Sequence, residues 1–502
     1  MENKLILATL LAVASVLALT EANPFKIAPI VQRMLDAFPV PNVPEGYVST
    51  NANTVGDEFE TRVDHFDPLN RAMFKFEYLS NDEFYQPGGP IFIFLGGNWP
   101  LTQYYIEHGH FHDIAKYENA WLFTNEHRYY GGSVPTEDLS AENLRFLSVE
   151  QAMVDVAEWI WHLRHNVVRD DNAKVILAGS GYAGAIGTWM RQRYPHLVDG
   201  VWVSSGQVEA RLNFMEYAFE IGEVIREYGS DDCYSTIWRG FRTGENLIDS
   251  GLSSTISNVF NTCLPVNGDD TLDVESFFYN LKEAFQSAIL QSPQTTESTE
   301  KLCHELGNST GQTDLHVLAE WAVNRYYYLD CLPFDFATSI EVFRNIDKNV
   351  PQNRIVGLRQ RMFQFCTEFG WFLTGDFPDQ PFGYRVTINF FLGFCQSVYG
   401  DWLTGDVVED GVHLTNLHFG GQNPHITKVL FTNGGLDPMR DISITDYHQS
   451  QANAIVIPGY FNSPDLNSIS GYNSPQLIQA KHDIQMYIES WLWESVIPVQ
   501  SD

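Results

Sequence analysis

Short apolar runs and amphipathic stretches alternate at both ends of the chain. The apolar runs are bounded by Gly, Asn or Ser, and helical patterns such as residues 149–164 separate them. The runs occupy residues 90–95, 120–124, 175–178, 200–204, 428–432 and 454–457. An amphipathic stretch over 476–493 ends this pattern. Apolar strands that alternate with helices predict an α/β fold, with a mostly parallel sheet covered on both faces.

The middle of the chain has a different pattern. Long helical stretches such as 273–290 and 316–327 replace the apolar runs. All six cysteines of the protein lie here: Cys233, Cys263, Cys303, Cys331, Cys366 and Cys395. We therefore expect the sheet to be interrupted by a helical cap, which also carries a glycosylation sequon at Asn308.

The N-terminus is typical of a secretory signal peptide. Lys4 supplies the positive end, residues 5–19 form an apolar run, and Thr20-Glu21-Ala22 fits a cleavage site. No later stretch reaches the roughly 18 apolar residues that a membrane span needs, and residues 499–502 carry no retention signal. We expect a secreted or lysosomal-lumen protein that makes no membrane contact. In such a chain six cysteines predict disulfides, and the sequence leaves their pairing open. The expected division of the chain is signal peptide 1–22, α/β domain 23–208, cap 209–410 and second part of the α/β domain 411–502.

The composition is strongly acidic. The chain has 63 Asp and Glu against 30 Lys and Arg, a net charge of −33. This charge disfavours nucleic acid and anionic membranes as partners. It suits an acidic lumen, although an acidic surface also simply keeps secreted proteins soluble.

A glycine-rich turn after the run at 175–178 has the layout of a nucleophile elbow. Such a turn is tight, so small residues must stand two positions before and after the nucleophile. Centring the turn on Gly181 places Gly179 and Ala183 there. Centring it on Ser180 would place a tyrosine where it should clash. The nucleophile position therefore falls on Gly181, which has no side chain.

The other members of a hydrolase triad follow in the order acid, then histidine. Asp437 follows the run at 428–432 and fits the acid. The base is expected in the loop 458–466, which contains no histidine. The nearest histidines in the sequence are His448, before the last apolar run, and His482, inside the last helix.

Several further segments are distinctive in combination: Val63–Phe66, Glu126–Gly131, Leu147–Ala152, Arg193–Gly200, Ser204-Ser205 and Cys366–Gly370. With the elbow they resemble the serine exopeptidases that include lysosomal Pro-X carboxypeptidase, dipeptidyl peptidase II and thymus-specific serine protease. The resemblance covers about residues 57–495. It implies an α/β-hydrolase domain with an inserted helical cap, dimerisation through that cap, and an ancestral removal of residues beside proline from peptide ends.

Residue by residue, the resemblance implies that this activity is lost. The family's serine aligns with Gly181, its acid with Asp437 and its histidine with Asn462. An acid in the loop after the first long strand is replaced by Asn98. Loss of the nucleophile or the base lowers turnover by on the order of 10⁶ in serine proteases.

The backbone N–H groups of Gly97 and Tyr182 remain as oxyanion donors, so a pocket without a nucleophile can still bind a peptide. Our first hypothesis is a pseudopeptidase that binds peptides or a protein partner, or pairs with an active relative. The second is an active exopeptidase in which Ser180 and a displaced histidine act together. The third is a structural secreted glycoprotein. Ser180 is interpreted as a turn serine. Its use as a nucleophile would require both a turn shifted by one residue and a histidine from elsewhere in the chain.

Alternate histidines at His108, His110 and His112 suggest a metal cluster. Residues 107–117 have a helical pattern, however, and positions two apart diverge on a helix. No Cys/His motif stands nearby. We expect no metal and no cofactor.

Overall fold

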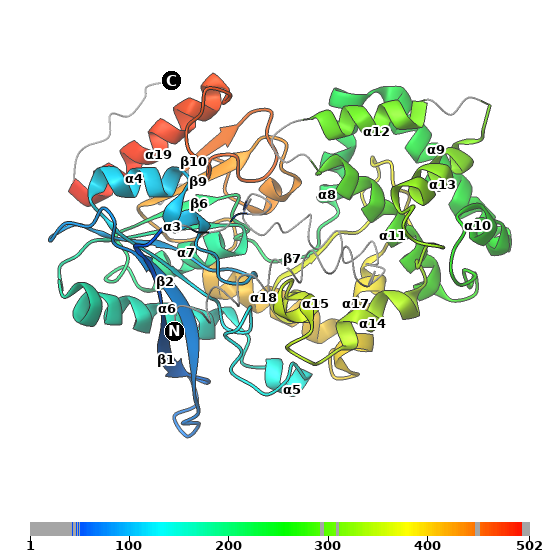
Figure 1. Cartoon of the computed structure of the whole chain (residues 1–502). Helices are drawn as coiled ribbons and strands as arrows, with labels where there is room; N and C mark the ends of the chain where they lie inside the picture. Colours follow the sequence, from blue (N-terminus) through cyan, green and yellow to red (C-terminus); the bar gives the residue numbers. More distant parts are fainter. Residues whose placement is uncertain are drawn as a thin grey trace.

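The computed structural model describes residues 43, 47, 49, 51–291, 296–307, 311–446 and 452–493. A sheet of eight strands forms the centre of one lobe (Figure 1). The strands are β1 (Thr54–Arg62), β2 (Met73–Asn81), β3 (Ile91–Phe94), β4 (Trp121–Asn125), β5 (Val175–Ser180), β6 (Gly200–Ser204), β9 (Val429–Gly434) and β10 (Ala452–Ile457). Their order is β1-β2-β4-β3-β5-β6-β9-β10. In this order, the six strands from β4 onward pair in parallel, and β2 pairs antiparallel with both β1 and β4. This is the α/β-hydrolase fold, as the sequence predicts.

All six predicted apolar runs are strands of this sheet, whereas the hairpin of β1 and β2 was not predicted. In β2 the side chains alternate between exposed and buried, so that Phe74, Phe76 and Tyr78 face the core. Such a strand is buried on one face only and carries no continuous apolar run. A pattern of continuous runs therefore does not reveal it.

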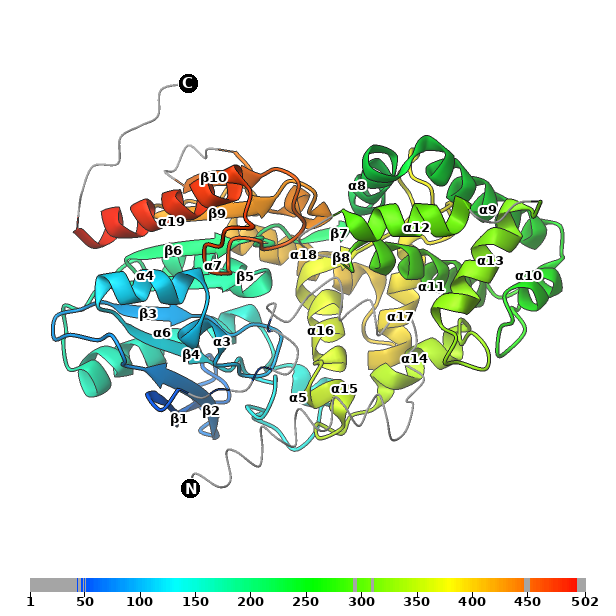
Figure 2. The ribbon, with the colours of Figure 1, turned by 45° about the horizontal axis from the view of Figure 1, so that its top comes forward.

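Helices cover both faces of the sheet because alternate strand residues point to opposite sides. Ile91 and Ile93 of β3 belong to one hydrophobic core, and Phe92 and Phe94 belong to the other. The first core packs against α6 (Val149–His162) and α7 (Tyr182–Arg193), and the second against α4 (His110–Glu118) and α19 (Pro475–Trp493) (Figure 2). Helix α7 begins at the residue after the elbow glycine.

The chain between β6 and β9 forms the second, helical lobe (Figure 1). Its helices include α8 (Glu216–Val224), α9 (Asp231–Asp249), α11 (Thr271–Ile289), α12 (Glu297–Gly307), α13 (Asp314–Arg325), α14 (Phe336–Arg344), α16 (Leu358–Gln364), α17 (Ile388–Tyr399) and α18 (Gly405–Phe419). A short parallel pair joins β7 (Arg211–Asn213) to β8 (Gly370–Phe372). The expectation of an inserted helical cap is confirmed.

Three disulfides brace the cap. They join Cys233 to Cys303, Cys263 to Cys331, and Cys366 to Cys395. The first two close segments of 70 and 68 residues. Cross-links over such long segments restrict the unfolded chain strongly, so they stabilise a lobe that lacks a large sheet.

The predicted cap boundary at residue 410 falls inside helix α18, which runs unbroken over this position. Phe419, at the end of α18, stacks on Trp189 of α7 with ring centroids 4.5 Å apart. This helix therefore packs against the hydrolase lobe as well as the cap. The signal peptide, Asn308 and His448 lie outside the described residues.

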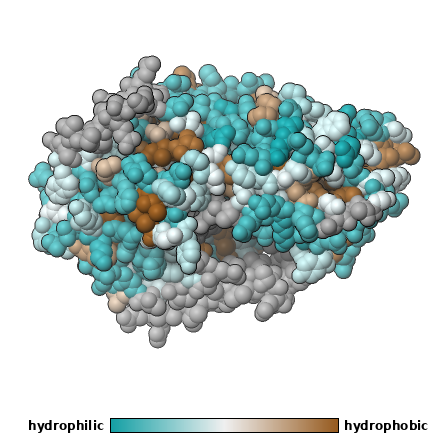
Figure 3. All heavy atoms as spheres, turned by 90° about the horizontal axis from the view of Figure 1, so that it is seen from above, coloured by the Kyte–Doolittle hydropathy of each residue, from teal (hydrophilic) through white to brown (hydrophobic). Residues whose placement is uncertain are grey.

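The face seen in Figure 3 is mostly hydrophilic, with several separate apolar patches. This matches a composition in which acidic residues greatly exceed basic ones. Among the described helices, none combines the length and the apolar character that crossing a bilayer requires.

Candidate active site

The sharp turn between β5 and α7 is centred on Gly181. Its backbone has φ 57° and ψ −127°, a conformation that residues with a side chain rarely adopt. Its N–H donates to the carbonyl oxygen of Ser204, 3.0 Å away at the end of the neighbouring strand β6. The structure thus places the strained residue of the elbow at Gly181 and not at Ser180.

Close backbone packing explains the small residues on either side. A Cβ atom on Gly179 would lie 2.7 Å from the carbonyl carbon and oxygen of Ala183. A Cβ atom on Gly184 would lie 2.9 Å from the oxygen of Gly179. Strand and helix therefore meet too closely here for larger side chains.

Gln207 occupies the space beside the elbow. A Cβ atom on Gly181 would lie 3.2 Å from Oε1 of this buried side chain. Gln207 Nε2 donates to the carbonyl oxygen of Ser205, 2.9 Å away. Sequence reasoning missed Gln207, although it stands two residues after the Ser204-Ser205 segment.

Ser180, the alternative nucleophile, is partly buried at the end of β5. Its Oγ lies 2.8 Å from Oγ of Ser463, which follows Asn462 in the loop where the base is expected. His482 is exposed on the outer helix α19. Within the described residues, the structure brings Ser180 to a second hydroxyl and to no histidine.

Asp437, the residue expected to be the acid, is 1% exposed. It caps the short 3-10 helix Pro438–Ile442, and its Oδ1 accepts a hydrogen bond of 2.9 Å from the N–H of Met439. Burial raises the pKa of Asp437 to about 6, against the lowering effects of Met439 N–H, the Ser205 hydroxyl and Arg440. The Ser205 Oγ makes no hydrogen bond of ordinary geometry to the described residues, so its effect on Asp437 is that of a nearby dipole. In this arrangement the carboxyl group braces its own loop.

The loop that should carry the base lies against the loop of the acid. The N–H of Leu436 donates to the carbonyl oxygen of Tyr460 at 2.9 Å, and that of Gly435 donates to Ile457 at 2.8 Å. Asn462 has φ 43°, a left-handed conformation that asparagine tolerates well. Its amide does not titrate near neutral pH and cannot act as a general base.

The two expected oxyanion donors follow neighbouring strands. Gly97 follows β3 and Tyr182 follows β5, and these strands pair directly. The ring of Trp99 packs over Gly97, where a Cβ atom would lie 2.6 Å from it. The N–H of Tyr182 opens helix α7, where backbone donors have no partner within the helix. This edge of the sheet therefore carries backbone hydrogen-bond donors beside Gly181.

Three of the distinctive sequence segments, Val63–Phe66, Glu126–Gly131 and Leu147–Ala152, meet in a buried network. Arg128 donates two hydrogen bonds to the carboxylate of Asp155, at 2.6 and 2.7 Å. His65 Nε2 lies 2.7 Å from the same carboxylate, and Gln151 binds both the N–H of His65 and Asp64 Oδ1. These residues hold the amino-terminal segment, the β4 loop and α6 together, so their role here is structural.

A second part of the network joins the cap to the hydrolase lobe. Glu368, in the π-helical turn after α16, accepts a hydrogen bond of 2.8 Å from the N–H of Val149. Gln364 Nε2 donates to Glu368 and to the hydroxyl of Tyr182, which also hydrogen-bonds with His127. Burial raises the pKa of Glu368 to about 7 and lowers that of His127 to about 4.

The three alternate histidines do not gather at one point. The ring centroids of His108 and His112 lie 6.4 Å apart, whereas His110 is bound elsewhere. His110 is buried on α4, where its Nε2 lies 2.8 Å from the carbonyl oxygen of Lys481. His108 precedes the helix, and His112 lies one half-turn beyond His110. Over the part of the chain that the structure describes, no group of three or more His, Cys, Asp or Glu side chains could hold a metal ion.

The sequence profile of the serine carboxypeptidase S28 family matches residues 61–484. The chain belongs to this family. Human thymus-specific serine protease is 29% identical over 448 residues, which cover 86% of each chain. Mouse lysosomal Pro-X carboxypeptidase is 25% identical over 464 residues, which cover 88% of this chain and 90% of that protein. The resemblance to these serine exopeptidases, which the sequence motifs indicated, is thereby confirmed.

Among solved structures, epoxide hydrolase A from Mycobacterium thermoresistibile is similar over 87% of this S28 chain and 98% of its own, with a TM-score of 0.35 and 11% identity.

Proposed function

We propose that this S28 family member does not hydrolyse peptides and acts instead by binding a peptide or a protein partner. The observation that carries the proposal is the glycine at the strained turn of the elbow, with φ 57° and ψ −127°. In S28 peptidases the nucleophile is a serine, as the family name states. Glycine offers no oxygen to attack a carbonyl carbon.

The expected base position supports the same proposal. Asn462 can donate and accept hydrogen bonds but cannot carry a proton from a nucleophile to a leaving amine. Asp437, with its carboxyl group turned to Met439 N–H, has no described histidine to orient. Binding requires less: the backbone N–H groups of Gly97 and Tyr182 would serve as its donors to a peptide carbonyl or carboxylate. Gln207 Nε2 already donates to the carbonyl oxygen of Ser205 and has one further N–H.

We further propose that the protein works in the lysosomal lumen or outside the cell. Three disulfides are consistent with an oxidising compartment. The lysosomal Pro-X carboxypeptidases among its relatives support the same placement.

The competing function is an exopeptidase that uses Ser180. The observation in its favour is the 2.8 Å contact between Ser180 and Ser463, which could relay a proton. The chemistry is unfavourable, because a serine hydroxyl is not a base at the pH of any cellular compartment. We therefore keep this function as the alternative outcome of the test.

The test measures turnover of proline-containing dipeptide amides and of carboxy-terminal Pro-X peptides, at about pH 5 and about pH 7.5. An active S28 relative is the positive control, and Ser180→Ala is the matched variant. We expect no turnover and no fluorophosphonate labelling beside the active control, together with measurable binding of proline-containing peptides by calorimetry. Turnover that disappears in Ser180→Ala would overturn the proposal.

A further inference from the structure

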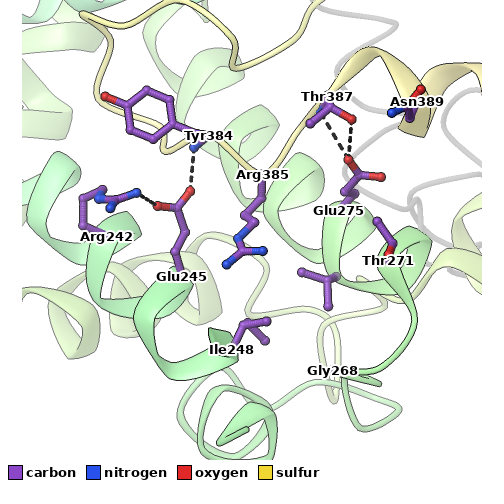
Figure 4. A pocket seen from close by; sticks show the side chains of 11 residues that line it. Arg242, Glu245, Ile248, Gly268, Thr271, Glu275, Tyr384, Arg385, Thr387 and Asn389 are labelled. Carbon is purple, nitrogen blue, oxygen red and sulfur yellow. Dashed lines mark hydrogen bonds and ion pairs between the residues drawn. The ribbon is translucent and has the colours of Figure 1, made fainter. Parts of the chain in front are cut away.

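The cap contains a cavity of about 490 Å³ that is separate from the elbow. It lies between α9, the first turn of α11 and residues 384–389, which lead into α17 (Figure 4). This volume is within the range of small-molecule sites. Two acidic and two basic side chains line the cavity, together with the aliphatic side chains of Ile248 and Val274.

One acid–base pair in the cavity, Glu245 and Arg242, is already satisfied by hydrogen bonds within the protein. Glu245 is buried and binds Arg242 with one carboxyl oxygen. Its other oxygen accepts a hydrogen bond from the N–H of Tyr384 (Figure 4). Both oxygens of Glu245 therefore have partners, so this pair leaves little charge for a ligand.

Glu275 is different, because half of its carboxyl group has no partner. The residue is 3% exposed, and its Oε1 accepts hydrogen bonds from Thr387 Oγ at 2.6 Å and Thr387 N–H at 3.4 Å. Its Oε2 is buried and meets no donor among the described residues. Figure 4 shows this second oxygen turned away from Thr387. A buried acceptor without a donor costs free energy, which a ligand carrying N–H groups would recover.

Arg385 supplies the opposite charge. Its Nη2 binds Asp249, but the Arg385 side chain is 32% exposed and that of Asp249 is 63% exposed. A guanidinium group has five N–H donors, so this single exposed contact leaves several for another acceptor. The positive charge of Arg385 acts on Glu275, since it lowers the pKa that burial of Glu275 raises.

We propose that this cavity binds a short peptide or amino acid through its two charged ends. The ammonium group donates to Glu275 Oε2, the carboxylate binds Arg385, and an aliphatic side chain packs against Ile248 and Val274. An ammonium group has three donors, and the planar fork of arginine matches a carboxylate. This site lies in the cap and does not depend on whether the elbow binds or cleaves peptides.

The test is calorimetric titration of the full glycosylated protein with the dipeptide Gly-Leu, its N-acetyl form and its C-terminal amide, and with free leucine. We expect Gly-Leu to bind and each blocked form to bind roughly 10-fold or more weakly. The comparison with leucine decides between a peptide and a free amino acid as the ligand. All of these titrations use the wild-type protein, so they are informative even if a cavity substitution impairs folding.

Variants then assign the site. Glu275→Gln keeps an acceptor for Thr387 and Arg385→Gln keeps a polar side chain, and each should weaken Gly-Leu binding by roughly 10-fold or more. Glu341→Gln removes the same charge from the exposed face of α14 and should leave binding unchanged. No binding of Gly-Leu or leucine at millimolar concentration overturns the proposal. So does binding that both cavity variants retain but that Gln207→Ala at the elbow alters, because that result assigns the peptide to the elbow.

Discussion

Ser180 and Ser463 share a hydrogen bond of 2.8 Å between their hydroxyl oxygens. It joins the end of β5 to the loop in which the family's histidine is expected. Ser463 Oγ also lies 3.5 Å from the carbonyl oxygen of Ser204, at the end of β6. Ser463 therefore links the ends of two neighbouring strands to the loop that follows β10.

Removing this link should cost stability and nothing else. Ser180→Ala and Ser463→Ala should each destabilise the protein by about 0.5–1.5 kcal/mol, the usual net contribution of one hydrogen bond. Because the two hydroxyls act on each other, the double variant should lose less than the sum of the single losses. Urea denaturation of all four proteins measures this coupling. Additive losses would show that the hydrogen bond contributes nothing.

Gly181→Ser restores a hydroxyl at the elbow but should not restore catalysis. We expect the free energy of unfolding to fall by about 1–3 kcal/mol, because the backbone there disfavours a side chain. In addition, the new Cβ atom would lie 3.2 Å from Gln207 Oε1. Fluorophosphonate labelling should stay at the background level in this variant. Adding Asn462→His should raise labelling above background, since the hydroxyl then has a base. Labelling of Gly181→Ser alone would show that another group already acts as the base.

Asp437→Asn should stabilise the protein above pH 6. The folded state raises the pKa of this acid from 3.8 to about 6, so its proton is held more tightly in the folded state than in the unfolded state. Stability from this group is complete below pH 3.8 and is lost as the pH rises through 6. Asparagine keeps an acceptor for Met439 N–H and carries no charge to bury. At about pH 7.5 we expect the free energy of unfolding of the variant to exceed that of the wild type by on the order of 1–3 kcal/mol. This difference should shrink towards about pH 4.

Urea denaturation at several pH values measures this difference. The matched control is Glu341→Gln, which removes one acidic side chain from an exposed position. A loss of stability in Asp437→Asn at high pH would mean that the ionised carboxylate has a favourable partner.

Glu368 should make the contact between the lobes weaker at high pH. Its folded pKa is raised from 4.5 to about 7, so its stabilising effect is complete below pH 4.5 and is lost as the pH rises through 7. Glu368→Gln should remove this loss. His127 has the opposite sign: its pKa is lowered from 6.5 to about 4, so its contribution is present above pH 6.5 and lost as the pH falls through 4.

Glu368 and His127 change the stability in opposite directions as the pH rises. The contribution of Glu368 is therefore given by the difference in stability between the wild type and Glu368→Gln. Thermal unfolding of both proteins between about pH 4.5 and about pH 8 measures it. The wild type should lose stability relative to the variant over that interval. A constant difference would show that Glu368 does not change its protonation state.

Local packing made the elbow accessible to sequence reasoning. Where the strand turns directly into the helix, a Cβ atom on Gly179 would lie only 2.7 Å from the carbonyl group of Ala183, so the positions of the small residues are enough to identify the turn. The sequence also revealed the parallel strands β3, β4, β5, β6 and β9, because their burial on both faces requires continuous apolar runs. The edge strand β10 has an apolar run as well, although it is partly exposed. The antiparallel hairpin escaped because only one of its faces is buried. Helix α12 begins at Glu297 within a stretch of polar residues that the sequence does not mark as helical.

The sequence by itself determined the family, the α/β-hydrolase fold with an inserted helical cap, and the glycine at the centre of the turn after β5, because these depend on residue type and on neighbours along the chain. Only the tertiary structure decided the pairing of the six cysteines, the hydrogen bond from Ser180 to Ser463, the placement of Gln207 beside Gly181, and the open carboxyl oxygen of Glu275 in the cap cavity. The disulfide partners, Ser180 and Ser463, and Glu275 and Arg385 lie tens to hundreds of residues apart in the chain. Local pattern carries no information about which of them meet, because the folding of the chain within each lobe brings them together.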